Sequence, residues 1–292
     1  MGERIILRDL SAREGFQILK HVVPTTDKLR LIKALTVAAV PEIEVTAFVR
    51  ADKVPQLADS EQLVSLLGHP PSGVKYRALG LNPRGFTRAL QFKNLTNDAW
   101  FYSGASDTFL SKNANTTFAK QLKDFATEWG TLWRANGLNE VRVMLSSAFG
   151  CAYEGVFGAE KIAARWQAIQ ETLAVNSFKC VELSLADTVG YATAETTADW
   201  IKKLRLVGAP EISLHLHDTR SNALQCVEAA LDLGVRIFEG SVAGLGGCPF
   251  TAGAAGNVAT EALVALLHKR GFQTGIDVNG LAAAVQIAQG FK

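Results

Sequence analysis

Two histidines and an aspartate lie close together in the sequence, in a pattern that suits a metal ion. His215 and His217 flank Leu216 at the end of a strand-like run, and Asp218 follows directly. Side chains two positions apart on a strand point to the same side, so both imidazoles face the same way. A single strand histidine is commonly a core residue, whereas two on one face beside an acidic residue favour a divalent-metal site.

A glycine-rich segment, VAGLGGCPFTAGAAGN, carries a second set of reactive groups. Gly246 and Gly247 let the backbone turn and present Cys248 as a thiol that could donate or accept a proton. Alternatively, Cys248 is a small buried residue of a tight turn. Glu261 and Asn257 close the segment. Asn257 stands where a helix should begin, so it could be an N-cap, or its carbonyl oxygen could bind a hard metal ion.

Eight strand-like runs alternate with helical segments, and these elements would position the reactive groups. No GxGxxG motif follows the first run, which argues against an open dinucleotide-binding sheet. Eight strand–helix units predict a (β/α)₈ TIM barrel whose active site lies at the C-terminal ends of the strands. We expect one domain, residues 1–292, with a closing helix over 281–290. The expected strands are 4–7, 42–47, 74–79, 99–103, 140–146, 179–185, 211–217 and 235–241, and the expected helices include 26–38, 116–136, 159–175, 194–206 and 221–233.

Charge and cysteine usage exclude several classes of protein. The 30 basic and 28 acidic side chains are spread along the chain, so neither nucleic acid nor a membrane is indicated as a partner. No apolar run is long enough to span a bilayer, and the start, MGERIILRDL, leaves no room for a targeting segment. The four cysteines are widely spaced without a CxxC pair, so no disulfide framework is expected. We therefore expect a cytoplasmic protein.

The motifs as a set resemble those of the 3-hydroxy-3-methylglutaryl-CoA lyases, within the DRE-type TIM-barrel metallolyases. In the family's order they are REGFQ, VVPTTDK, IEVTAFV, VPQLAD, SSAFGCAYEG, SLADTVG, HLHDT, SVAGLGGCPF, GAAGNVATE and TGIDVNGL, and they span nearly the whole chain. The resemblance implies a homo-oligomeric enzyme that cleaves a hydroxyacyl-CoA substrate by a metal-dependent retro-aldol reaction. The products would be an acyl-CoA and a keto acid.

The resemblance also implies a ligand set for the metal. Glu14, His215, His217 and Asn257 match the family's metal ligands. Because this set is rich in oxygen and lacks a thiolate, Mg²⁺ or Mn²⁺ is expected rather than Zn²⁺. An upstream Arg-Asp pair could compete for the alignment, but the spacing to the VVP motif favours Glu14, and Asp9 is expected to be a strand-end residue.

The remaining catalytic roles are likewise implied by the resemblance. Arg13 matches the arginine that stabilises the enolate oxygen, and Cys248 matches the loop cysteine of proton transfer. Glu44, Asp187 and Glu261 match active-site acids of the family. Glu44 and Asp187 could instead orient Arg13 or hold the ends of strands.

Three departures from the family pattern affect the substrate. Glu14 replaces an aspartate and is one methylene longer, Ala47 replaces a serine, and Arg220 with Ser221 replaces a Tyr-Gly pair. Arg220 could pair with a substrate carboxylate, or it could cap a helix or face solvent. With Gln17 and Arg13 it forms the expected substrate-binding set. A substrate related to 3-hydroxy-3-methylglutaryl-CoA, rather than that thioester itself, is therefore expected.

Two other functions remain open from the sequence. One is an aldolase or condensing enzyme of the same superfamily, such as a 2-isopropylmalate synthase or a 4-hydroxy-2-oxovalerate aldolase, although the GGCPF loop argues against both. The other is a barrel that has lost catalysis and acts as a binding protein, because Glu14 and the changed 220–221 pair alter the motif. Metal binding without lyase activity would favour the second.

Overall fold

The computed structural model describes residues 2–247 and 256–292. Its contacts divide the chain into two compact units, which are described separately here. Met1–Asn97 and Ile237–Lys292 form one, called the N/C unit, and Asp98–Arg236 form the other, called the central unit.

The N/C unit contains a parallel sheet with the strand order β3-β2-β1-β10. The first stretch of chain supplies β1 (Ile6–Asp9), η1 (Ser11–Gly15), α1 (Thr25–Val37), β2 (Glu42–Ala47), η2 (Pro55–Leu57), α2 (Ser60–Leu67), β3 (Lys75–Leu79) and α3 (Pro83–Ala89). The second stretch supplies β10 (Ile237–Gly240), η4 (Val242–Gly244), α10 (Thr260–Lys269) and α11 (Val278–Gln289).

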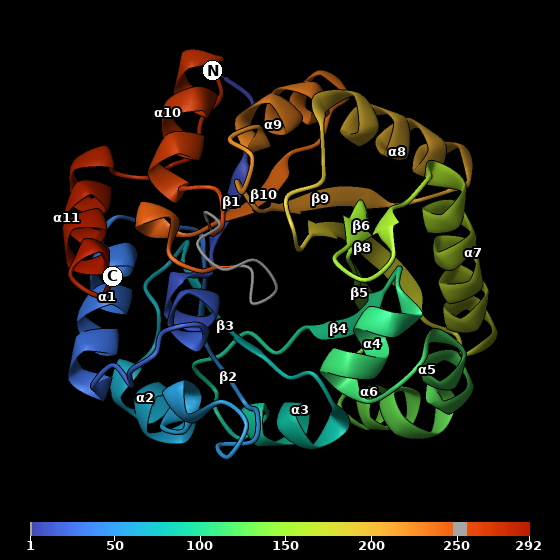
Figure 1. Cartoon of the computed structure of the whole chain (residues 1–292). Helices are drawn as coiled ribbons and strands as arrows, with labels where there is room; N and C mark the ends of the chain where they lie inside the picture. The colour runs from blue at the N-terminus through green and yellow to red at the C-terminus, as the bar shows by residue number, and fades with distance from the viewer. Residues whose placement is uncertain (1, 248–255) are drawn as a thin grey trace. The chain divides into compact units, whose positions relative to one another are not determined.

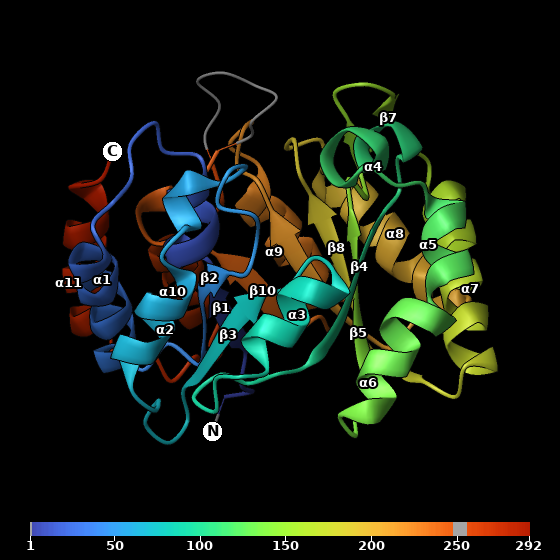
Figure 2. The same ribbon diagram turned by 90° about the horizontal axis from the view of Figure 1, so that it is seen from below.

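The two stretches of the N/C unit pack together through both their strands and their helices. β1 pairs with β10 in register from Ile6 opposite Ile237. The helices α1 and α11, from opposite ends of the chain, lie side by side (Figures 1 and 2). α1 buries Leu31, Ile32 and Leu35, the one-turn spacing that forms a single apolar stripe. All six residues of β2 are buried, as expected for a strand covered on both faces.

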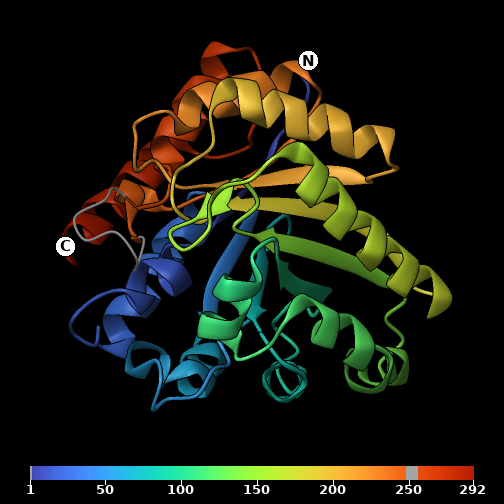
Figure 3. The same ribbon diagram turned by 45° about the vertical axis from the view of Figure 1, so that its right-hand side comes forward.

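The central unit contributes four parallel strands in the order β9-β8-β5-β4. Figure 3 shows β5, β8 and β9 side by side, with α7 and α8 on one face of them. A short antiparallel hairpin joins β6 to β7. The elements are β4 (Ala99–Gly104), α4 (Asp107–Ala114), α5 (Phe118–Asp124), η3 (Ala126–Gly130), α6 (Thr131–Ala135), β5 (Glu140–Ser146), β6 (Gly150–Cys151), β7 (Gly155–Val156), α7 (Ala159–Val175), β8 (Lys179–Asp187), α8 (Ala194–Leu206), β9 (Glu211–Leu216) and α9 (Ala223–Asp232).

An aromatic cluster fixes α5, η3 and α6 against the central sheet. Phe125 packs edge to face on Phe101 of β4, with ring centroids 5.3 Å apart, and on Phe178 at 5.6 Å. Trp133 packs on Phe125 at 5.6 Å. Each edge-to-face pair adds about 1 kcal/mol beyond the burial of its area. The cluster explains why the polar stretch around residue 124 stays attached to the sheet.

The eight strands expected from the sequence all form, and their ends differ from the predictions by at most two residues. One expected helix, 116–136, is wrong as a single element: it is divided into α5, the π-helix η3 and α6. The helices α2, α3 and α4 were not among those named from the sequence, whereas α10 begins at Thr260, three residues after Asn257, where a helix was expected to begin. Within the part of the chain that the structure describes, no helix is both long and apolar enough to cross a membrane.

Candidate active site

The short π-helix η1 places two candidate residues just beyond the end of β1. Its wide turn forms because the carbonyl of Leu10 accepts from the backbone nitrogens of Glu14 and Gly15, at 2.8 and 3.4 Å. Gly15 is required there, since a Cβ would lie 2.9 Å from the Cβ of Leu245. Ser11 and Gly15 face inward, which leaves Arg13 and Glu14 half-buried on the other side.

Arg13 lies between two carboxylates of the N/C unit. Its Nε donates to Oε2 of Glu44 on β2 at 2.5 Å, and its Nη1 donates to Oε2 of Glu14 at 2.9 Å. Burial raises the pKa of Glu44, although the charge of Arg13 opposes that rise. The suggestion that Glu44 orients Arg13 therefore agrees with the geometry.

Asn257 is held by its amide nitrogen, and its side-chain oxygen takes no part in these hydrogen bonds. Nδ2 donates to Oγ of Ser241 at 3.3 Å and to the carbonyl of Leu245 at 3.1 Å. Oδ1 is buried and accepts no hydrogen bond from any residue in 2–247 or 256–292. A buried, unsatisfied carbonyl oxygen is costly without a partner, and it suits a metal ion. The N-cap alternative is wrong, because α10 begins at Thr260 with Ala259 as its cap.

Glu261 has a structural partner in this conformation. Both of its carboxylate oxygens accept from the backbone nitrogen of Ala243 in η4, each at 3.1 Å. Ala243 has a positive φ of 57°, which is unusual for a residue with a side chain. Glu261 therefore stabilises a strained turn, and its predicted role as a catalytic acid stays a prediction.

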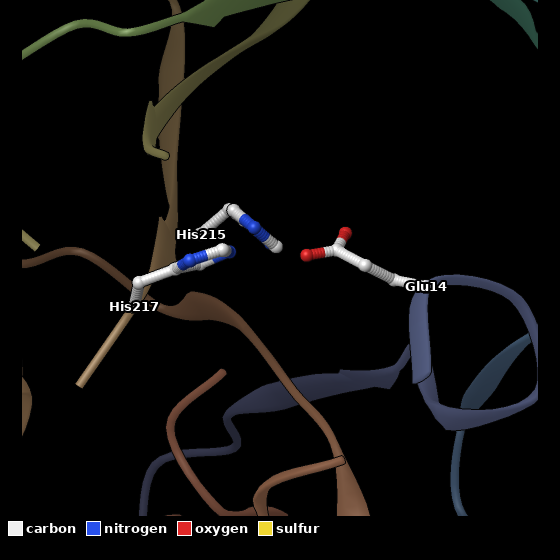
Figure 4. A group of neighbouring side chains, drawn as sticks. All are labelled: Glu14, His215 and His217. Atoms are coloured by element: carbon white, nitrogen blue, oxygen red, sulfur yellow. The ribbon is translucent and has the colours of Figure 1, made fainter. Parts of the chain in front are cut away.

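His215 and His217 lie at the end of β9 in the central unit. Both are buried, with 5% and 4% of their surface exposed. Their rings lie side by side with centroids 5.2 Å apart (Figure 4), as their spacing on one face of a strand predicted. Imidazoles so placed can offer nitrogen ligands to one ion.

Asp187 is the last residue of β8, next to the histidine strand. Its carboxylate accepts from the backbone nitrogens of Tyr191 at 2.9 Å and Ala192 at 2.7 Å. Burial raises its pKa, while these hydrogen bonds and the nearby imidazole of His217 lower it. These hydrogen bonds agree with one of the alternatives expected for Asp187, that it holds the end of a strand, and its predicted role as a catalytic acid stays a prediction.

The remaining expected residues are at the surface or outside the described chain. Gln17 is exposed and lies two residues after the end of η1. Arg220 is also exposed, and its guanidinium carbon lies 4.6 Å from the centroid of the Tyr191 ring. Tyr191 was not singled out from the sequence, and no motif pointed to it. Cys248 lies outside the described residues.

The comparisons with solved structures define the fold. The HMG-CoA lyase of Brucella melitensis superposes with a TM-score of 0.88 at 33% identity, covering 99% of this chain and 98% of that one. The HMG-CoA lyase of Acinetobacter baumannii, in complex with coenzyme A and 3-methylmalate, gives 0.85 at 28% identity, with 99% and 91% covered. The predicted class, an α/β TIM barrel, is therefore confirmed.

Sequence comparisons then define the family. Hydroxymethylglutaryl-CoA lyase of Gallus gallus is 35% identical over 280 residues, 96% of this chain and 90% of that protein. The 3-hydroxy-3-isohexenylglutaryl-CoA/hydroxy-methylglutaryl-CoA lyase of Pseudomonas aeruginosa is 34% identical over 295 residues, 98% and 92% of the two chains. The HMGL-like family model matches residues 4–287, and the chain belongs to this family. The predicted enzyme class, a carbon–carbon lyase, is confirmed at the level of the family.

Proposed function

We propose that this chain cleaves a hydroxyacyl-CoA thioester related to 3-hydroxy-3-methylglutaryl-CoA by a divalent-metal-dependent retro-aldol reaction. The bond between the carbinol carbon and the carbon next to the thioester breaks, and its electron pair passes to a thioester enolate. The carbinol becomes the ketone of a keto acid, and protonation of the enolate carbon gives an acyl-CoA. The Arg13–Glu44 pair is the observation that carries this proposal, because it fixes a cation for the enolate oxygen.

The metal ligands in this proposal are Glu14, His215, His217 and Asn257. They offer a carboxylate, two imidazoles and an amide oxygen, a set that suits Mg²⁺ or Mn²⁺. The buried Oδ1 of Asn257 fits such a role. When bound, the ion supplies a Lewis acid that lowers the pKa of the substrate hydroxyl and orients the bond to be cleaved.

The other proposed roles belong to residues of the chain itself. Glu14 or a histidine accepts the hydroxyl proton, and Arg13 donates hydrogen bonds to the enolate oxygen. Cys248 protonates the enolate carbon. Asp187, the last residue of β8, and Glu261, in the first turn of α10, complete the proposed catalytic set.

The proposal extends to the substrate and the setting of the enzyme. Gln17 and Arg220 contact the substrate, whose carboxylate or coenzyme A phosphates would attract the guanidinium. Residues 1–292 act as one domain of a homo-oligomer in the cytoplasm. Neither nucleic acid nor a membrane takes part.

Metal removal followed by a substrate panel tests the proposal. Protein stripped with a chelator should lose cleavage of 3-hydroxyacyl-CoA thioesters and regain it with Mn²⁺ or Mg²⁺. Asn257→Ala should weaken Mn²⁺ binding. Asn94→Ala is the matched control, because Asn94 also donates two side-chain hydrogen bonds, to the carbonyls of Val64 and Gly68, but has no proposed ligand role. Activity that is unchanged by chelator would overturn the mechanism.

A further inference from the structure

Asp9 is a buried carboxylate to which the proposed reaction gives no role. It is the last residue of β1, as the sequence predicted, and none of its surface is exposed. Burial of an ionised carboxylate is costly unless several donors surround it. The donors that surround Asp9 therefore indicate which elements this carboxylate holds together.

The Asp9 carboxylate accepts hydrogen bonds from three separate elements of the N/C unit. Oδ1 accepts from the backbone nitrogen of Ser11 in η1 at 2.9 Å. Oδ2 accepts from the backbone nitrogen of Val242 in η4 at 3.1 Å and from Oγ1 of Thr260 in α10 at 2.7 Å. Oγ of Ser11 also accepts from the nitrogen of Val242, at 2.7 Å, which closes the cluster.

Each of these three elements either carries a proposed metal ligand or adjoins a residue that holds one in place. η1 carries Glu14 three residues after Ser11. Val242 follows Ser241, whose hydroxyl accepts from Nδ2 of Asn257. The backbone of Ser241 also accepts from the nitrogen of Thr260 at 3.1 Å. One carboxylate therefore links the turn that bears Glu14 to the turn that orients Asn257.

We propose that Asp9 is a positioning residue that fixes Glu14 and Asn257 relative to each other for metal binding. All three of these partners are donors, so an isosteric amide would direct its own N–H at one of them. The cluster would then open, and the two ligands would lose their common anchor. This inference rests on the proposed function, because it takes Glu14 and Asn257 as ligands.

The test is calorimetric titration of Mn²⁺ alone into the metal-stripped full chain. Asp9→Asn should lower Mn²⁺ affinity on the order of tenfold to a hundredfold, the usual effect of losing a group that orients metal ligands. Thr260→Val removes only the hydroxyl donor and should lower the affinity by a smaller factor. This second variant keeps the test valid if Asp9→Asn does not fold.

Thr46→Val is the matched control. Thr46 and Thr260 are both fully buried, and the hydroxyl of Thr46 bonds to that of Ser60, at 2.8 Å. The control should lower the thermal unfolding midpoint as Thr260→Val does, while Mn²⁺ affinity stays at the wild-type value. If Asp9→Asn and Thr260→Val both bind Mn²⁺ with wild-type affinity, Asp9 has only a structural role. That result would overturn this inference but not the proposed function. A wild-type chain that binds no Mn²⁺ would overturn the proposed function and this inference with it.

Discussion

The guanidinium of Arg13 and the carboxylate of Glu44 are joined by a 2.5 Å hydrogen bond from Nε to Oε2. This bond crosses from η1, just beyond the end of β1, to the third residue of β2, so the two elements together orient one cation. A guanidinium that is already held in this way loses less conformational entropy on binding an enolate than an unrestrained guanidinium would. The direction of the side chain is thus set before substrate arrives.

Replacing Arg13 should abolish most turnover while the fold survives. Arg13→Met removes the donors proposed for the enolate oxygen, and losing such a donor costs on the order of a hundredfold to a thousandfold in kcat. Steady-state kinetics and thermal unfolding measure the two effects. Arg50→Met is the control, because Arg50 forms an exposed pair with Asp52 and should not affect kcat. Near-wild-type turnover in Arg13→Met would remove Arg13 from its role.

Shortening Glu14 should change which thioester is preferred. A displacement of about an ångström at a reacting group can cost on the order of a hundredfold, so the extra methylene should penalise 3-hydroxy-3-methylglutaryl-CoA unless the pocket has moved with it. Glu14→Asp should therefore raise kcat/KM for that thioester relative to others in a panel. The altered-substrate hypothesis is wrong if the wild type already cleaves that thioester as well as any other and Glu14→Asp brings no improvement.

Removing the charge of Arg220 should weaken substrate binding more than chemistry. Arg220 is stacked on Tyr191 at the surface, where a charge-assisted hydrogen bond to an anionic group contributes about 1.5 kcal/mol, or roughly tenfold in KM. Arg220→Gln should raise KM and leave kcat nearly unchanged. Arg30→Gln, at an exposed arginine near Asp27, is the control. Equal KM values for the two variants would show that Arg220 faces solvent and does not bind the substrate.

The buried ion cluster of Glu42, Arg8 and Arg77 should make the free energy of unfolding depend on pH under acidic conditions. Burial alone would raise the pKa of Glu42, but the charges of Arg8, at 2.6 Å, and Arg77, at 2.9 Å, lower it from 4.5 to about 2. A carboxylate with a lowered pKa stabilises the fold above pH 4.5, and that stabilisation is lost as the pH falls towards 2. The shift corresponds to about 3 kcal/mol.

Glu42→Gln makes this effect measurable. At pH 7 the variant should unfold with a free energy lower by about 3–5 kcal/mol, since two guanidinium groups lose their buried anion. Urea denaturation from pH 7 to pH 2 should show the gap between wild type and variant narrowing below pH 4.5. A gap that stays constant over that range would contradict the assigned pKa.

The strands were predictable from the sequence because each is a short apolar run ended by a turn. The run 42–47, for example, has the same bounds in the sequence and in β2. The interruption of 116–136 was not predictable, since apolar spacing does not reveal that the helix hydrogen bonds shift in η3. The helix η1 was missed because five residues are too few to show a helical period.

The sequence indicated which residues could form the proposed site, but not the contacts that support them. The spacing of His215 and His217 predicted that both side chains lie on one face of their strand. The role proposed for Asp9 could not be read from the sequence, because its partner Thr260 is 251 positions away in the chain. The N-cap alternative for Asn257 failed because the chain continues for two more residues before α10 begins.

The pairing of β1 with β10 has a consequence for synthesis of the chain. Arg8 and Glu239 contact each other across 231 positions, whereas the central unit is one continuous stretch. As the chain leaves the ribosome, Asp98–Arg236 can therefore fold while β1 still lacks its neighbour. The strand β10, which pairs with β1, and the residues Val242 and Thr260, which donate to Asp9, are synthesised only in the last fifth of translation. A chaperone that shields this nascent edge would protect the assembly of the proposed metal site as well as the fold.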